Sequence, residues 1–85
     1  MTAKQALGEV VGSNEYLRLR YIIAKASIGE SDTPERCREA IRALTRSIKR
    51  VIRKLWRELP DSERQKFKNL LQGEMERLRK LLNAS

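Results

Sequence analysis

The sequence predicts an all-α protein, a small bundle of three main helices preceded by a short, weak N-terminal helix. Apolar residues recur at alternating spacings of three and four over long stretches, as on one side of an amphipathic helix. Glycine and proline are scarce, with four and two among 85 residues, and both prolines stand where a helix could begin. A chain of this length forms one domain with a marginal core, and 40% hydrophobic with 35% charged residues is typical of a charged chain that folds.

The first predicted element is a short, weak helix over residues 2–11. Thr2 and Gln5 have the spacing of a capping box, Gly8 weakens the helix, and Gly12 ends it. Its narrow apolar stripe consists of Ala6, Leu7, Val10 and Val11. We therefore set residues 1–12 apart as a segment that could fray, and assign residues 13–83 to a single helical-bundle domain.

The second predicted helix covers residues 14–28, with Ser13 as its cap and Gly29 as its stop. The alternation of residues 17–21 also fits a strand, but no second strand is available to pair with it. One face of the helix carries Tyr16, Leu19, Ile22, Ile23 and Ala26, and the opposite face carries Leu17, Tyr21, Ala24 and Ile28. A helix that is apolar on two sides is buried between other elements or used in assembly, so we expect a protein partner or a second copy of the chain here.

The third and longest helix is predicted over residues 34–59, after a loop from Gly29 to Thr33. Thr33 caps it, Pro34 occupies the first helical position, and at the standard rise it is about 39 Å long. Its apolar seam consists of Cys37, Ile41, Leu44, Ile48, Val51, Leu55 and Leu59.

The last helix is predicted over residues 62–82, after a tight break at Leu59–Glu63 in which Asp61 is the expected cap. Its apolar stripe consists of Phe67, Leu70, Leu71, Met75, Leu78, Leu81 and Leu82. So short a connection predicts that the last two helices form an antiparallel αα-hairpin. Glu74 falls within the apolar stripe, where we expect it to reach solvent or to pair with a basic residue of a neighbouring helix.

The positive charge is concentrated on the third helix. Residues 36–57 contain nine basic residues and one acid, a sum equal to the net charge of +8 of the whole chain. At about 100° per residue, six cations fall on the side opposite the apolar seam. This set, here called the basic stripe, consists of Arg42, Arg46, Lys49, Arg50, Arg53 and Arg57. Trp56 lies at the edge of the seam, where it either stacks on a base or partner surface or covers the core.

Catalytic and metal chemistry are not indicated. The chain has no histidine and a single cysteine, Cys37, which we interpret as the first residue of the apolar seam. No glycine-rich phosphate loop occurs. We therefore expect no enzyme activity, no cofactor and no metal.

The unpaired basic stripe favours a polyanionic partner. The sequence predicts a small non-enzymatic nucleic-acid-binding protein, or an accessory subunit of a nucleic-acid-processing complex such as one of DNA replication. It would contact phosphates with little sequence preference, with DNA favoured over RNA. In composition and architecture the chain resembles small accessory subunits of nucleic-acid machinery.

Two alternatives stay open. The basic helix could dock on an acidic protein without contacting nucleic acid, or acids such as Glu58, Glu63, Glu74 and Glu76 could neutralise the stripe within the fold. A helix-turn-helix is disfavoured because Lys25 stands where a small residue is usual and the following helix is too long. The single cysteine and the lack of long apolar runs lead us to expect a cytoplasmic protein, which could associate with the nucleoid, and no membrane partner.

Overall fold

The computed structural model describes residues 1–30 and 33–83, and within them every regular element is a helix. The elements are α1 (Ala3–Val11), α2 (Asn14–Ser27), α3 (Pro34–Glu58) and α4 (Asp61–Asn83). The all-α prediction is therefore confirmed, and the strand alternative for residues 17–21 is wrong because they lie within α2. Residues 31–32 of the expected loop lie outside the described residues.

The expected helix caps are present for the first three helices. The hydroxyl groups of Ser13 and Thr33 each accept a hydrogen bond from the backbone N–H three residues later, at 3.3 and 3.2 Å. Thr2 and Gln5 form the capping box of α1. Gly29 has a φ of 78°, a left-handed conformation that glycine adopts without the steric cost of a Cβ atom, and it stops α2 as predicted.

The start of α4 corrects the prediction by one residue. Asp61, expected as the cap before the helix, is its first residue, and its carboxylate accepts a hydrogen bond from Arg64 at 2.8 Å. The backbone N–H groups of Glu63 and Arg64 donate instead to the carbonyl of Pro60. A carboxylate in the first turn is still favoured there, because the N-terminus of a helix carries partial positive charge.

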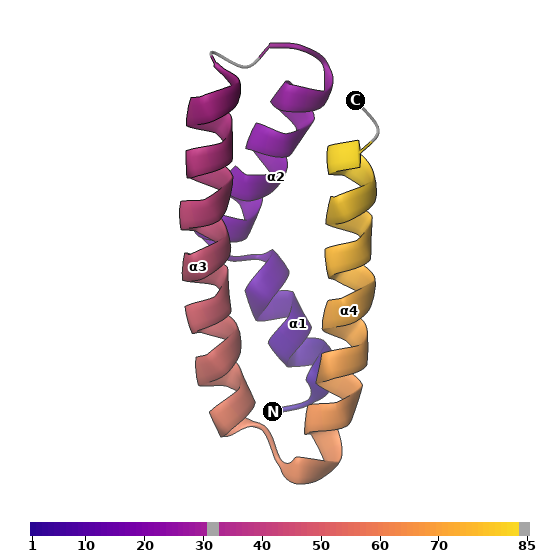
Figure 1. Cartoon of the computed structure of the whole chain (residues 1–85). Coiled ribbons are helices and arrows are strands. Elements are labelled where there is room, and N and C mark those ends of the chain that lie inside the picture. The colour runs from indigo at the N-terminus through magenta and orange to yellow at the C-terminus, as the bar shows by residue number, and fades with distance from the viewer. Residues whose placement is uncertain (31–32, 84–85) are drawn as a thin grey trace.

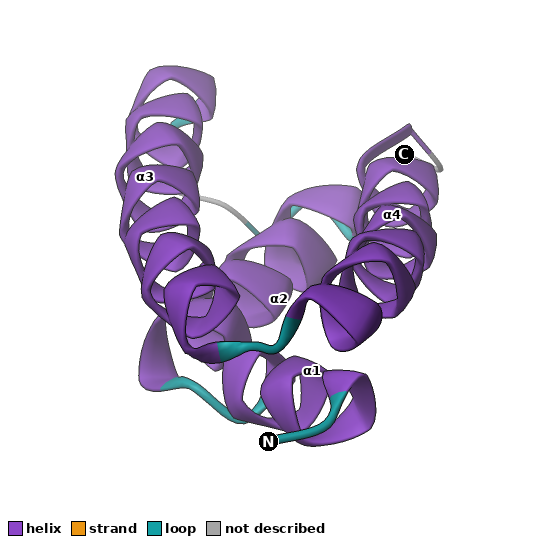
Figure 2. Cartoon of the chain, turned by 90° about the horizontal axis from the view of Figure 1, so that it is seen from below, coloured by secondary structure: helices purple, strands orange, loops and turns teal. Residues whose placement is uncertain are grey.

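The four helices form two layers. The longer helices α3 and α4 run antiparallel along the length of the molecule, and α1 and α2 together lie behind them, α1 at the end near the α3–α4 turn and α2 at the other end (Figure 1). Seen from below, α3 and α4 stand apart like the two arms of a V (Figure 2). The molecule is elongated, with Cα extents of 42 × 20 × 15 Å.

The antiparallel direction of α3 and α4 agrees with the predicted hairpin, but the two helices do not pack closely on each other. Among the described residues, α3 packs chiefly on α2, and α4 packs on both α1 and α2, while direct contact between α3 and α4 is slight. The short connection at Leu59–Pro60 fixes the reversal of the chain and not the separation of the two helices. That separation is set by the layer behind them.

The N-terminal helix is part of the core. We expected residues 1–12 to form a weak segment that could fray, and in the structure Ala3, Ala6 and Val10 are buried against the rest of the bundle. The backbone N–H of Ala3 also donates to the carboxylate of Glu63 in α4 at 3.0 Å. Small side chains allow α1 to approach α4 closely, so a narrow apolar stripe is enough to anchor it.

One apolar cluster joins all four helices. Its most fully buried large side chains are Tyr16, Phe67 and Val10, from α2, α4 and α1, and α3 contributes Ile48, which is also buried. No side chain in the described residues is left with a buried polar atom lacking a hydrogen-bond partner. The core therefore holds α3 by one side only and leaves its opposite side, which carries the basic stripe, in solvent.

Candidate functional site

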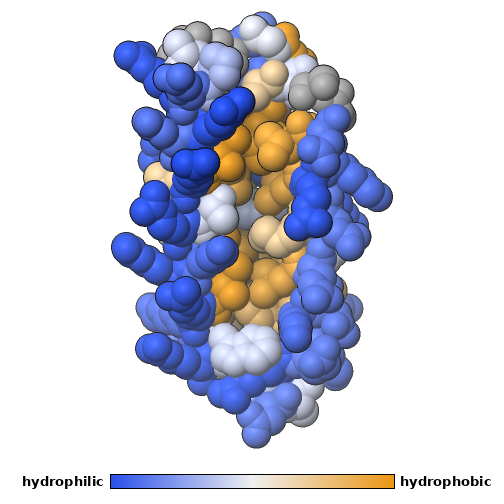
Figure 3. Space-filling model, in the orientation of Figure 1, coloured by the Kyte–Doolittle hydropathy of each residue, from blue (hydrophilic) through white to orange (hydrophobic). Residues whose placement is uncertain are grey.

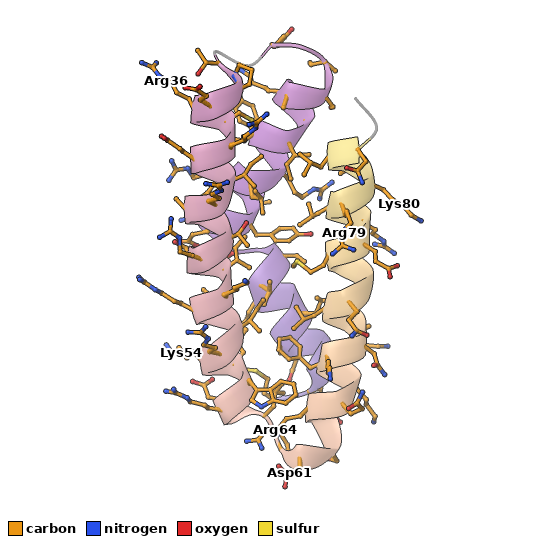
Figure 4. All side chains as sticks on the ribbon, in the orientation of Figure 1. Arg36, Lys54, Asp61, Arg64, Arg79 and Lys80 are labelled. Carbon is orange, nitrogen blue, oxygen red and sulfur yellow. The ribbon has the colours of Figure 1, made fainter. Side chains whose placement is uncertain are left out.

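The basic stripe lies on the solvent-facing side of α3. Its six members, Arg42, Arg46, Lys49, Arg50, Arg53 and Arg57, are all exposed, as is the neighbouring Lys54. Leu44, Ile48 and Leu55 of the same helix are buried on the other side. Figure 4 shows Lys54 pointing away from the body of the molecule. The helical periodicity of the sequence thus placed these residues on one face correctly.

No member of the basic stripe forms a salt bridge with any residue that the structure describes. Three salt bridges are found in residues 1–30 and 33–83, and each joins two residues of α4 three positions apart. They are Arg64–Asp61 at 2.8 Å, Lys66–Glu63 at 3.6 Å and Arg77–Glu74 at 3.0 Å.

The acids that could have neutralised the stripe are engaged elsewhere or remain apart from it. Glu63 contacts Lys66 and the backbone of Ala3. Glu58 and Glu76 are exposed and form no ion pair with another described residue. The structure therefore does not support neutralisation of the stripe by direct ion pairs within the described part of the fold.

Glu74 has a structural role in the interface between α2 and α4. It accepts a hydrogen bond from the hydroxyl of Tyr16 at 2.7 Å and pairs with Arg77 of its own helix. We expected Glu74 either to reach solvent or to pair with a base of a neighbouring helix, and the base it pairs with belongs to α4 itself. Burial, together with the hydrogen bond to Glu74 and its negative charge, raises the pKa of Tyr16 to about 12. The pair satisfies two polar groups that would otherwise be costly at the core boundary.

The structure adds a feature that sequence patterns do not reveal, an apolar groove between α3 and α4. Figure 3 shows the hydrophobic floor of this groove between two hydrophilic walls. The space between the helices is about 750 Å³. Its apolar lining consists of Leu19 and Ile23 from α2, Ile41, Ile48 and Ile52 from α3, and Leu71, Met75, Leu78 and Leu82 from α4.

Cations stand on both walls of the groove. Lys49 of the basic stripe lines the α3 side, and Lys68 and Arg79 line the α4 side (Figure 4 labels Arg79). From the sequence we expected α4 to supply an apolar stripe and acids that could neutralise the basic stripe, and we did not predict its two groove cations. The signal was present, because Lys68 and Arg79 both lie about 100–120° from Phe67 around the helix, beside the apolar stripe.

Trp56 closes the end of the groove near the turn between α3 and α4. It is half-buried, packs against the core cluster, and lines a second space of about 500 Å³ with Arg53, Arg57 and Lys68. The guanidinium of Arg64 lies 5.9 Å from the centre of its ring. Trp56 therefore covers the core, as one of our two interpretations held, and also borders the groove.

Residues 1–30 and 33–83 contain no group of three or more histidine, cysteine, aspartate or glutamate residues placed to hold a metal ion. None of the helices, as far as they are described, combines the length and the apolar character needed to cross a membrane.

Comparisons with protein-family models, with curated proteins and with solved structures gave no match to this chain. The features that point to a function are therefore the two surfaces that α3 helps to form, the basic stripe and the groove.

Proposed function

We propose that this protein is a non-enzymatic nucleic-acid-binding protein, or an accessory subunit that gives a nucleic-acid-processing complex such as a replication complex additional grip on DNA. The observation that carries the proposal is the exposed basic stripe on α3, which forms no ion pair with the described residues. Like charges four residues apart on a helix repel each other, so such a stripe costs stability unless an anionic partner meets it.

The length of the stripe suits a nucleic-acid duplex, and we propose DNA rather than RNA as its partner. From Arg42 to Arg57 it follows a straight helix for about 22 Å, a length over which a DNA duplex presents about 13 phosphate charges. Arginine and lysine contacts to phosphates carry no direct sequence information. Binding is therefore expected to be largely independent of sequence and strongly dependent on salt.

A salt series tests this proposal. We expect five or six phosphate contacts. A plot of the logarithm of the affinity for a nonspecific duplex against the logarithm of the salt concentration should then have a slope of about −5. Gel shift or fluorescence anisotropy with a labelled duplex measures it. Absence of binding at low salt would overturn the proposal, as would a slope near zero.

A charge-matched pair of variants locates the contact. Reversal of Arg42, Arg46 and Arg50 to glutamate should abolish binding to the duplex at low salt. Reversal of Lys4, Arg18 and Lys80, which are exposed and lie off α3, lowers the net charge of +8 by the same amount. This control should retain most of the affinity. Equal loss in both variants would show that total charge, and not the stripe, governs binding.

The competing function is a protein-interaction subunit that docks its basic helix on an acidic partner. A second observation favours some protein contact, because Leu17, Tyr21 and Ile28 on the outward face of α2 are 51%, 60% and 68% exposed. We expect a partner or a second copy to cover this face. Light scattering on the purified chain, compared with a Leu17→Glu variant, measures self-association through α2.

A further inference from the structure

The groove between α3 and α4 is long enough to hold several turns of a helix. Its two spaces share Ile52, Lys68 and Leu71, so they adjoin each other along the gap between α3 and α4. On α3 the lining runs from Ile41 to Arg57, which is about 24 Å along the helix. A groove of that length matches about four helical turns.

The groove leaves the apolar faces of α3 and α4 incompletely covered, at the position that a further helix would occupy in a closed bundle. In a closed bundle each long helix buries its apolar face against neighbours on both sides. Here Ile41 and Ile52 of α3, and Leu71 and Met75 of α4, are only half-buried, because the facing helix stands too far away. An additional helix laid along the groove would contact α3, α4 and the α2 floor at once, and would bury these four side chains.

The charged residues along the two walls of the groove, here called the rim, determine which charges such a helix needs at its edges. Five cations line the groove, Lys49, Arg53 and Arg57 on α3 and Lys68 and Arg79 on α4, against one acid, Glu76. An apolar helix face flanked on both sides by glutamate or aspartate would complement both the floor and the two walls. A face flanked by basic residues would be repelled.

We propose that this groove binds an amphipathic α-helix of a partner protein, with an apolar stripe for the floor and acidic residues along both edges of that stripe. The mode is that of a helix laid into a hydrophobic groove, read out through apolar anchors at spacings of three and four. This site goes beyond the proposed nucleic-acid function. It lies between α3 and α4 and shares Lys49, Arg53 and Arg57 with the basic stripe, whereas the other three stripe residues, Arg42, Arg46 and Arg50, do not line it.

A second copy of the chain is a poor occupant. Among the described residues, the large apolar side chains with more than half of their surface exposed are Leu17, Tyr21 and Ile28, on α2 and at its C-terminal end. Another copy would therefore enter the groove with this face. That face is flanked by Arg18, Arg20 and Lys25. Placing these cations against the cationic rim would bring like charges together. A nucleic-acid duplex is also a poor occupant, since its charged backbone gains nothing from an apolar floor.

The test uses three synthetic peptides of about 18 residues, long enough to cover about 27 Å as helices. The first has a leucine stripe with glutamate along both edges, the second has the same composition in scrambled order, and the third has lysine in place of glutamate. Fluorescence anisotropy of each labelled peptide, titrated with the full chain at physiological salt, measures affinity. We expect the first peptide to bind at least about tenfold more tightly than the other two. The scrambled peptide controls for simple attraction between an acidic peptide and a basic protein.

Substitutions of exposed rim residues test the proposal without disturbing the core. The double variant Lys68→Glu with Arg79→Glu changes two exposed side chains of α4. It should weaken the acidic amphipathic peptide by about tenfold or more and strengthen the lysine peptide. The matched variant Lys4→Glu with Lys80→Glu makes the same change in net charge away from the groove, and should alter both affinities little. Equal binding of the ordered and scrambled peptides, or no response to the rim variant, would overturn the proposal.

Two further outcomes would identify a different occupant of the groove and would also overturn the proposal of a partner helix. One is a dimer, seen by light scattering, that the rim variant dissociates. The other is binding of oleate by the wild-type chain but not by the rim variant, with no binding of the peptide. The two proposals can fail separately, because the triple reversal at Arg42, Arg46 and Arg50 should remove duplex binding and change peptide affinity by less than about threefold.

Discussion

The two long helices, α3 and α4, differ in how acids and bases are distributed along them and in whether these residues form ion pairs. In α3 the acids stand near the ends, at Glu35, Glu39 and Glu58, and the cations between them form no ion pair with a described residue. In α4 two pairs of acids, Asp61 with Glu63 and Glu74 with Glu76, are each followed by bases. The three salt bridges of the described chain all lie in this helix.

The difference indicates which charges belong to the fold. Glu63 and Glu74 of α4 connect that helix to α1 and α2 through hydrogen bonds of 3.0 and 2.7 Å. The basic stripe of α3 makes no comparable connection. We infer that Glu63 and Glu74 of α4 contribute to folding, whereas the cations on the outer side of α3 are available for a partner. Four substitutions, in order of decreasing expected effect, test this inference.

The largest effect is expected where α4 enters the core. Phe67 has 0% of its surface exposed, so Phe67→Ala leaves a cavity and should lower the free energy of unfolding by about 3–5 kcal/mol. For a chain this small that loss is close to complete unfolding. Urea denaturation followed by circular dichroism measures it. The control Leu81→Ala removes a side chain that is 42% exposed and should cost at most about 1 kcal/mol. Similar losses in both variants would show that α4 is not fixed by this side chain.

The next effect concerns the acid that joins α4 to α2. Glu74→Ala removes the acceptor of the Tyr16 hydroxyl and the partner of Arg77, and should destabilise the protein by about 1–3 kcal/mol. Glu76→Ala, two residues away and exposed, should change stability by less than about 0.5 kcal/mol. Equal losses of stability at the two positions would show that the contacts of Glu74 do not contribute to the stability of the fold.

The same contact predicts a dependence of stability on alkaline pH. Because the folded state raises the pKa of Tyr16 from 10.0 to about 12, the folded protein keeps the phenol proton in a range where the unfolded chain loses it. The stabilisation is complete below pH 10 and is lost as the pH rises toward 12. Tyr16→Phe should cost about 1 kcal/mol at neutral pH and should flatten this part of the profile. Unfolding titrations between these pH values measure both, and an unchanged profile in the variant would contradict the assignment.

The smallest effect is expected on the basic stripe, and it has the opposite sign. Arg50 lies four residues from both Arg46 and Lys54, so Arg50→Glu replaces two repulsions with two attractions. Stability should rise by about 0.5–1 kcal/mol, while affinity for duplex DNA should fall. Chemical denaturation of the variant and of an Arg18→Glu control measures the first quantity. A loss of stability specific to Arg50→Glu would mean that the stripe serves the fold.

Part of the candidate site could be predicted from the sequence, because it depends on local geometry. Helical periodicity is enough to place the basic stripe on one side of α3 and Ile48 on the other. The same reasoning found the caps at Ser13 and Thr33, where one side chain meets a backbone group three residues away. It did not find the groove, because the cations at Lys68 and Arg79 become neighbours of Lys49 only across the gap between two helices.

The sequence by itself therefore determined four helices, their ends to within a residue or two, and the concentration of positive charge on one side of the longest. Each of these follows from interactions between residues a few positions apart. The tertiary structure decided that α1 belongs to the core, that Glu74 serves Tyr16, and that α3 and α4 stand apart over an apolar floor. The spacing of two helices depends on the side chains of the layer packed behind them. No pattern within α3 or α4 alone contains that information.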